Sequence, residues 1–252
     1  MGFWFGCSLS LSELGCPRLF HKEKIVRNTS ECVILAADGL DLPQVLDLVD
    51  EIGDRLYAVK IHSLWDRHGP GVVRQLLDAG APRIWVDLKL HDIPETVRDR
   101  AKAVAESGAH MVTVHASGGI EMMMAACESG IDVIAVTVLT SLEEDEVHLL
   151  HGHPSKAEVL ALTRLARMAG VPSVVCSPRE VGILAKRPEL KGMNFITPGV
   201  RSLGVAVDDQ KRVDTPANAI KAGATRLVIG RQITRADSPL AALEPIELEI
   251  NA

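Results

Sequence analysis

A strand-then-helix pattern repeats along this chain from residue 33 onwards, and it limits the possible folds more than any other feature. Apolar segments with the length and composition of buried strands lie at 33–38, 57–62, 83–90, 111–116, 132–140, 173–177, 194–199 and 226–230. Helical patterns lie between them, for example at 42–52, 72–79, 96–107, 157–169 and 215–222. From Asp38 to Gly230 the repeat averages roughly 27 residues, so the sequence predicts an α/β fold, a single-domain (β/α)8 TIM barrel.

A doubly wound open sheet is the competing architecture. In its dinucleotide-binding form this fold carries Gly-x-Gly-x-x-Gly after the first strand. No such motif follows segment 33–38. Glycines at 53, 80, 108, 130, 170 and 223 stand where the helices of the repeat should end, as expected for either fold.

The first thirty residues differ from the repeats that follow. Serines and Glu13 interrupt their apolar run and no basic residue precedes it, whereas a secretory signal has a basic start and an unbroken apolar core. We therefore expect residues 1–30 to be an N-terminal extension outside the barrel rather than a targeting sequence, and residues 31–252 to form the barrel domain. No run approaches the roughly 18 apolar residues that span a membrane.

Composition excludes several classes of partner and suggests a compartment. The net charge of −6 gives no reason to expect nucleic acid or an anionic membrane as a partner, so any phosphate site must be a local cluster. The chain has five cysteines, an odd number without C-x-x-C spacing. This usage suits a reducing compartment, and we expect a cytoplasmic protein.

The segment 86–96 places two carboxylates around one lysine at the end of an apolar strand. Because side chains alternate along a strand, Asp87 and Lys89 should point to the same face. Asp92 follows where the chain bends towards Pro94 and a helix begins. A lysine between carboxylates should stay protonated and could deliver a proton. The alternative is a structural ion pair at a barrel rim.

Other polar residues stand at the carboxyl ends of the predicted strands, where barrel enzymes carry their chemistry. With Asp87 and Lys89, this set contains Asp38, Lys60, His115, Thr140, Arg201 and Arg231. Gly230 lets the backbone approach a phosphate closely, and backbone N–H groups with Arg231 could bind its oxygens. Arg201 and Gln210, on the preceding βα loop, strengthen this prediction of a phosphate site.

The segment 87–96 resembles the catalytic motif of the orotidine 5'-monophosphate decarboxylase family, Asp-x-Lys-x-x-Asp-Ile-Pro-x-Thr, and fills every fixed position. The resemblance, closest to the bacterial members, extends over residues 33 to about 240 and includes Val114 to Gly119, Thr197 to Arg201 and Asp209 to Val213. It implies a (β/α)8 barrel that decarboxylates orotidine 5'-monophosphate to uridine 5'-monophosphate in de novo pyrimidine synthesis.

The resemblance also implies roles for individual residues. Lys89 would donate the proton, with Asp87 facing the leaving carboxylate and Asp92 completing the charged array. Asp92 and Thr96 would come from a neighbouring subunit, which implies a homodimer with shared active sites. The binding residues implied for ribose, base and phosphate are Asp38, Lys60, Thr96, Thr140, Arg201, Gln210, Gly230 and Arg231. The scheme needs no cofactor and no metal.

Some positions depart from the family pattern. The opening 36–41 leaves either Asp38 or Asp41 as the ribose contact, and we choose Asp38 because it directly follows the strand. Gln232 replaces a common proline and Asp208 a common glycine, beside the predicted phosphate contacts. Both changes could alter the mobility of the loop.

Two other functions stay open from the sequence. A metal-dependent sugar-phosphate decarboxylase or hexulose-phosphate synthase shares Asp-x-Lys-x-x-Asp, but would need Mg²⁺ ligands and would lack the Ile-Pro-x-Thr continuation. A non-catalytic nucleotide-binding barrel would tolerate loss of the lysine or its carboxylates. Histidines 148, 151 and 153 could suggest a metal site, but solvent-facing loop histidines are the simpler interpretation because the spacing supplies no carboxylate or cysteine.

Overall fold

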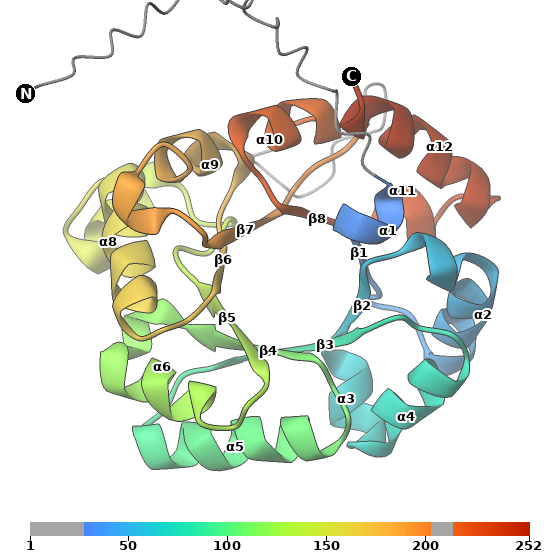
Figure 1. Ribbon diagram of the computed structural model, residues 1–252, viewed down its shortest axis with the longest axis horizontal. Helices are drawn as coiled ribbons and strands as arrows, with labels where there is room; N and C mark the ends of the chain where they lie inside the picture. Colours follow the sequence, from blue (N-terminus) through green and yellow to red (C-terminus); the bar gives the residue numbers. More distant parts are fainter. Residues whose placement is uncertain (1–27, 203–213) are drawn as a thin grey trace, which may run out of the picture.

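The computed structural model describes residues 28–202 and 214–252, in which eight parallel strands close into a barrel (Figure 1). Each strand pairs with the next, and β8 pairs with β1, so the predicted barrel is confirmed and an open sheet is excluded. The strands are β1 (Val33–Ala36), β2 (Ala58–Ile61), β3 (Ile84–Leu90), β4 (Met111–His115), β5 (Asp132–Val136), β6 (Ser173–Val175), β7 (Asn194–Pro198) and β8 (Arg226–Ile229). Strand β5 ends four residues before the expected boundary, so Thr140 lies in the loop after it.

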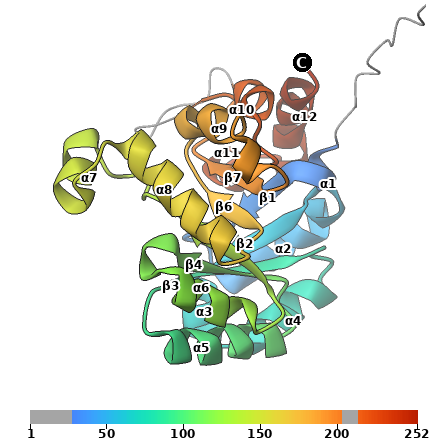
Figure 2. The same cartoon turned by 60° about the vertical axis from the view of Figure 1, so that its left-hand side comes forward.

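Helices surround the barrel and cover the outer face of the sheet (Figure 1). They are α1 (Thr29–Cys32), α2 (Leu42–Ile52), α3 (Ser63–His68), α4 (Gly71–Asp78), α5 (Pro94–Glu106), α6 (Ile120–Cys127), α7 (Glu144–His151), α8 (Ser155–Met168), α9 (Pro178–Leu184), α10 (Pro216–Ala222), α11 (Arg231–Thr234) and α12 (Pro239–Ile250). Short 3₁₀ turns are η1 (Gly53–Arg55), η2 (Ala116–Gly118) and η3 (Pro188–Leu190). Figure 2 shows α7 standing away from the barrel wall.

The apolar side chains form two separate cores. The larger core lies between the sheet and the helices, where the buried stripe of each amphipathic helix meets the outward-facing strand residues. The smaller core fills the inside of the barrel and consists of Ile34, Ala58, Trp85, Met111, Ile134, Ile196 and Val228. Trp85 is the bulkiest of these residues, and it also lines the cavity described below.

Packing against the barrel begins at Thr29, two residues before the expected domain boundary at residue 31. Helix α1 begins at Thr29, whose side chain is buried, and α1 contacts α12 and β8. Most of the expected extension, residues 1–27, lies outside the described residues. In the described part of the chain, no helix is long and apolar enough to cross a membrane.

Candidate active site

A cavity of about 520 Å³ opens at the carboxyl ends of the strands. Its wall is built from β1, β2, β3, β5, β6, β7, β8 and the loops that follow them. The cavity brings together most of the predicted site residues: Asp38, Lys60, Asp87, Lys89, Thr140, Arg201, Gly230 and Arg231. This position matches the end of the barrel where the fold carries its chemistry.

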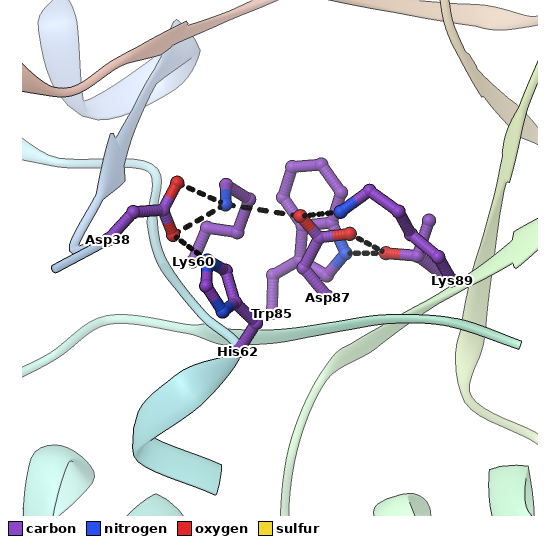
Figure 3. A network of polar contacts seen from close by, with 7 residues as sticks. Asp38, Lys60, His62, Trp85, Asp87 and Lys89 are labelled. Carbon is purple, nitrogen blue, oxygen red and sulfur yellow. Dashed lines mark hydrogen bonds and ion pairs between the residues drawn. The ribbon is translucent and has the colours of Figure 1, made fainter. Parts of the chain in front are cut away.

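Four charged side chains form a continuous chain of ion pairs across one wall of the cavity (Figure 3). Lys60 Nζ lies 2.9 Å from Asp38 Oδ1 and 3.1 Å from Asp87 Oδ2. Lys89 Nζ donates to the same Asp87 oxygen at 2.8 Å. Within one subunit, therefore, Lys60 is the lysine that lies between two carboxylates. Asp87 pairs with two lysines.

The inner pair of this chain, Lys60 and Asp87, is buried. Burial alone would lower the pKa of Lys60, but the carboxylates of Asp87 and Asp38 outweigh it and raise the pKa above its usual value. Burial would likewise raise the pKa of Asp87, but Lys60, Lys89 and a hydrogen bond from Thr113 lower it overall. Both groups are therefore held in their charged forms.

An irregularity in β3 places Lys89 beside Asp87. Val86 pairs with Val112 and Leu90 with Val114, so residues 87–89 together face the single residue Thr113. Lys89 has a φ of +49°, a left-handed conformation that side chains disfavour. The side chain of Lys89 is 39% exposed, whereas that of Asp87 is 7% exposed. The alternation of a regular strand predicted the shared face, but the bulge and strained φ were not visible in the sequence.

The structure separates the two aspartates that the sequence left as alternatives. Asp38 lines the cavity, where it contacts Lys60 and also lies 3.1 Å from His62 Nε2. Asp41 instead caps α2. Its carboxylate accepts a hydrogen bond from the backbone N–H of Gln44 at 3.0 Å, and the Gln44 side-chain oxygen accepts one from the backbone N–H of Asp41. Only Asp38 faces the cavity.

Sequence reasoning missed two side chains that support Asp87 from below. The indole Nε1 of Trp85 donates to Thr113 Oγ1 at 2.6 Å, and Thr113 donates to Asp87 Oδ1 at 2.8 Å (Figure 3, in which Thr113 is drawn without a label). Both residues are buried. Strand alternation could have found them, because Trp85 lies two residues before Asp87 and Thr113 two before His115.

The part of the cavity wall formed by the loops after β7 and β8 carries the predicted phosphate contacts. Gly230 and Arg231 begin the turn after β8, and Arg201 lies in the loop after β7. A Cβ on Gly230 would lie 3.3 Å from the carbonyl oxygen of Ala36 in β1, so a side chain there would be tight. Gln210 and Asp208 fall in 203–213 and lie outside the described residues.

Gln232, one of the departures from the family pattern, joins the two loops of this part of the wall. Its Nε2 donates to Ser202 Oγ at 2.8 Å, and its Oε1 accepts from the backbone N–H of Ser202 at 2.9 Å. A proline at position 232 could form neither bond. These bonds hold together the chain segments that carry Arg201 and Arg231.

Asp92 and Thr96 do not line the cavity within one chain. Asp92 is exposed, and its carboxylate accepts from the backbone N–H of Ile93 at 2.7 Å. Thr96 is half-buried on the first turn of α5. The expectation that Asp92 approaches Lys89 across a subunit interface therefore stays a prediction about the assembly.

None of the histidines noted in the sequence is among the residues that line the cavity. The ring of His115, at the end of β4, is 5.5 Å from that of His91, and burial followed by the charges of His91 and Lys89 lowers the pKa of His115. On α7, His151 Nδ1 lies 3.2 Å from Glu158. Within 28–202 and 214–252, no three His, Cys, Asp or Glu side chains gather in a metal-binding arrangement.

Comparison with known proteins gives a consistent result. Residues 31–246 match the model of the "Orotidine 5'-phosphate decarboxylase / HUMPS family". The orotidine 5'-phosphate decarboxylase of Pseudoalteromonas translucida is 40% identical over 231 residues, covering 88% of this chain and 97% of its own. That of Alkalilimnicola ehrlichii is 42% identical over 228 residues, covering 87% and 96%.

A solved structure is similar in three dimensions as well as in sequence. The crystal structure of orotidine 5'-phosphate decarboxylase from Lactobacillus acidophilus superposes with a TM-score of 0.74 at 34% identity. The match covers 88% of this chain and all of the other. The likeness therefore extends over most of this chain.

We expect Lys60→Met to lower the free energy of unfolding by about 3 kcal/mol at pH 7.5, because it leaves the buried Asp87 without its innermost partner. In the native protein the lowered pKa of Asp87 stabilises the fold above the unfolded value of about 3.9, and this contribution is lost as the pH falls through the folded value. In the variant, burial favours protonation of Asp87 at a higher pH, so its deficit should shrink between pH 7.5 and pH 5. Urea unfolding at both values measures this.

Lys102→Met is the matched control for this experiment. Lys102 is exposed on α5 and lies 3.9 Å from Glu106, and exposed pairs of this kind contribute about 0.5 kcal/mol or less. A deficit of Lys60→Met that stays the same at pH 5 would show that Asp87 does not depend on Lys60 for its charge.

Proposed function

The chain belongs to the orotidine 5'-phosphate decarboxylase / HUMPS family, and we propose that it decarboxylates orotidine 5'-monophosphate to uridine 5'-monophosphate in pyrimidine biosynthesis. This activity makes it a carboxy-lyase. The observation that carries the proposal is that the chain of ion pairs from Asp38 to Lys89 lines the same cavity as Arg201 and Arg231. Orotidine 5'-monophosphate has a carboxylate at one end and a phosphate at the other.

In the proposed reaction, Lys89 is the proton donor. The bond between C6 of the pyrimidine and its carboxylate breaks, the electron pair stays on C6, and carbon dioxide leaves. The Lys89 ammonium stabilises the developing carbanion and then transfers a proton to C6. The partial exposure of Lys89 in the cavity wall supports this role, because its Nζ can reach a bound ligand while Asp87 holds it.

Asp87 is proposed to face the substrate carboxylate. Thr113 and two lysines keep Asp87 ionised and fixed, so a second negative charge beside it is unfavourable until carbon dioxide leaves. The preorganised ammonium of Lys89 is the main source of transition-state stabilisation, because it needs no reorientation as charge develops. No organic cofactor enters this scheme.

The remaining residues are proposed to grip the two other parts of the substrate. Asp38 and Lys60 would bind ribose hydroxyls, and Thr140 would lie near the base. Arg201, Gly230 and Arg231 would bind the phosphate together with Gln210 of the 203–213 segment. Binding energy gained at this remote phosphate can be used to assemble the site around the reacting end.

We further propose a homodimer in which Asp92 and Thr96 complete the partner's site. Two observations support it: neither residue lines the cavity of its own chain, and the adjacent Ile93 is 65% exposed. A subunit contact that brings Asp92 and Thr96 to the partner's site would also cover the Ile93 side chain. Residues 31–252 would form the decarboxylase domain and residues 1–30 an extension, in a reducing compartment such as the cytoplasm.

Lys89→Ala should fold and should reduce kcat at least 100-fold, because removal of a general acid typically costs this much. Lys89→Gly is the matched control for the backbone, since glycine accepts the positive φ without strain. Both variants should be equally inactive while differing in thermal stability. The loss of orotidine 5'-monophosphate absorbance, with and without EDTA, measures activity and detects any dependence on a divalent metal. A kcat above about a tenth of wild type in either variant would remove Lys89 from the chemistry.

The shared site can be tested by mixing two inactive variants. A dimer of one Lys89→Ala subunit and one Asp92→Asn subunit contains one intact site, so random exchange should restore about a quarter of wild-type activity. Lys89→Ala mixed with Asp87→Asn is the control. Because these residues lie in the same chain's site, no exchange produces an intact site and activity should stay low. Equal recovery in both mixtures, or none in the first, contradicts the proposed sharing.

Arg231→Ala should raise KM strongly and also lower kcat, because the phosphate is remote from the bond that breaks and its binding energy supports the transition state. Orotidine without its 5'-phosphate should be a very poor substrate of the wild type, and the substitution should impair its turnover far less. Steady-state kinetics on both substrates make the comparison. If the two substrates lose activity by the same factor, Arg231 does not bind the phosphate.

A further inference from the structure

A buried line of hydrogen bonds leads from the floor of the barrel to the carboxylate at the centre of the site. Trp85 donates to Thr113 at 2.6 Å, and Thr113 donates to Asp87 at 2.8 Å (Figure 3). Trp85 belongs to the inner core of the barrel, and Thr113 has no exposed surface. The line therefore connects the rigid interior of the fold to Asp87.

The direction of both hydrogen bonds follows from the chemistry of the groups. An indole N–H can only donate, so the Thr113 oxygen accepts from Trp85. The single hydroxyl proton of Thr113 then points to Asp87 Oδ1, because an ionised carboxylate can only accept. The other oxygen, Oδ2, accepts from Lys89 at 2.8 Å and lies 3.1 Å from Lys60 Nζ. Both oxygens of Asp87 are thereby fixed.

We propose that Thr113 and Trp85 are positioning residues for the reaction, which orient Asp87 and keep it ionised; this inference rests on the proposed function. Trp85 holds the Thr113 hydroxyl in the orientation that donates to Oδ1. Asp87 is then unable to rotate about its Cβ–Cγ bond, and Oδ2 stays where Lys89 needs it. Since a displacement of reacting groups by about 1 Å can cost 100-fold in rate, this restraint affects turnover rather than binding.

The local backbone makes such a restraint necessary. Thr113 lies opposite the bulge at 87–89, where the regular pairing of β3 with β4 is interrupted. Hydrogen bonds of the strand ladder do not fix Asp87 there in the usual way. The hydroxyl of Thr113 replaces that restraint with a bond to the side chain itself.

Charged and titratable groups reach Asp87 from three strands: Lys60 from β2, Lys89 from β3 and His115 from β4. Asp38 acts on it through Lys60. Burial raises the pKa of Asp87, and the hydrogen bond from Thr113 is one of the interactions that together lower it below its usual value. Loss of the hydroxyl should therefore let Asp87 protonate at a higher pH.

The test compares four variants, among which Thr113→Val removes the hydroxyl with almost no change in side-chain volume. Thr113→Val should lower kcat about 10- to 100-fold, the effect of one lost hydrogen bond to a charged group, with little change in KM. The acidic limb of the kcat–pH profile should move to higher pH. Thr113→Ser should recover most of the activity, because it restores the hydroxyl. Trp85→Phe keeps an aromatic ring near Lys60 but removes the N–H, and should cost only a few-fold. The double variant should be no worse than Thr113→Val.

Thr163→Val is the matched control. Thr163 is equally buried, but its hydroxyl donates within α8 to the carbonyl of Val159 at 2.6 Å. Its substitution tests the stability effect of losing a buried hydroxyl and should leave kcat and the pH profile unchanged. If Thr113→Val behaves like this control, the proposal is overturned. If Thr113→Val does not fold, an unchanged pH profile in Trp85→Phe overturns it instead.

A measurement without substrate separates this proposal from the proposed function. The Asp87 carboxyl can be titrated by carbon-13 NMR in the wild type and the variants, with Asp87→Asn to assign the signal. The signal should titrate at a higher pH in Thr113→Val than in the wild type, whatever reaction the enzyme catalyses. Equal titration in the two proteins contradicts the positioning role, whereas absence of decarboxylation by the wild type contradicts only the proposed function.

Discussion

The rest of the site depends on the buried carboxylate of Asp87 and on the contacts that neutralise its charge. This carboxylate forms ion pairs with Lys60 of β2 and Lys89 of β3, and it accepts a hydrogen bond from the Thr113 hydroxyl of β4. A buried carboxylate is tolerated only when its charge is paired and its lone pairs are satisfied. Both conditions are met here, and each partner that meets them is thereby fixed in place. The need to neutralise one buried charge thus fixes the positions of Lys60, Lys89 and Thr113.

The shape of β3 follows from the same requirement. In a regular strand Lys89 would lie on the same face as Asp87 without a positive φ. Here β3 is bulged at 87–89, Lys89 has a φ of +49°, and its ammonium lies 2.8 Å from Oδ2. Among the described residues, Lys89 is the one residue other than glycine with a positive φ. Such a conformation costs on the order of 1–2 kcal/mol and persists because the ion pair and the surrounding barrel hold it.

The fold and most of the site could be predicted from the sequence because both follow periodic rules. Each predicted strand is present, and all of the polar residues predicted at the strand ends except His115 line one cavity. Two features could not be predicted. The pairing of Lys60 with Asp87 depends on the register of β2 against β3. Strand alternation places Trp85 and Thr113 on the inner face, but their hydrogen bonds to each other and to Asp87 depend on the register of β3 against β4. Both features are contacts between segments distant in sequence, which a single sequence without comparison does not encode locally.

The geometry of the charged motif supports the proposed catalytic role of Lys89 over a purely structural ion pair. A structural ion pair needs two partners in low-strain conformations, and an apolar pair of similar size would often stabilise the fold equally well. Here one lysine, Lys60, is enclosed by two carboxylates and satisfies the structural need. Lys89 adds a second cation in a strained conformation, with its side chain partly exposed to the cavity. Strain retained at a cavity wall, where it aims a charged group at the space for a ligand, is typical of a catalytic residue.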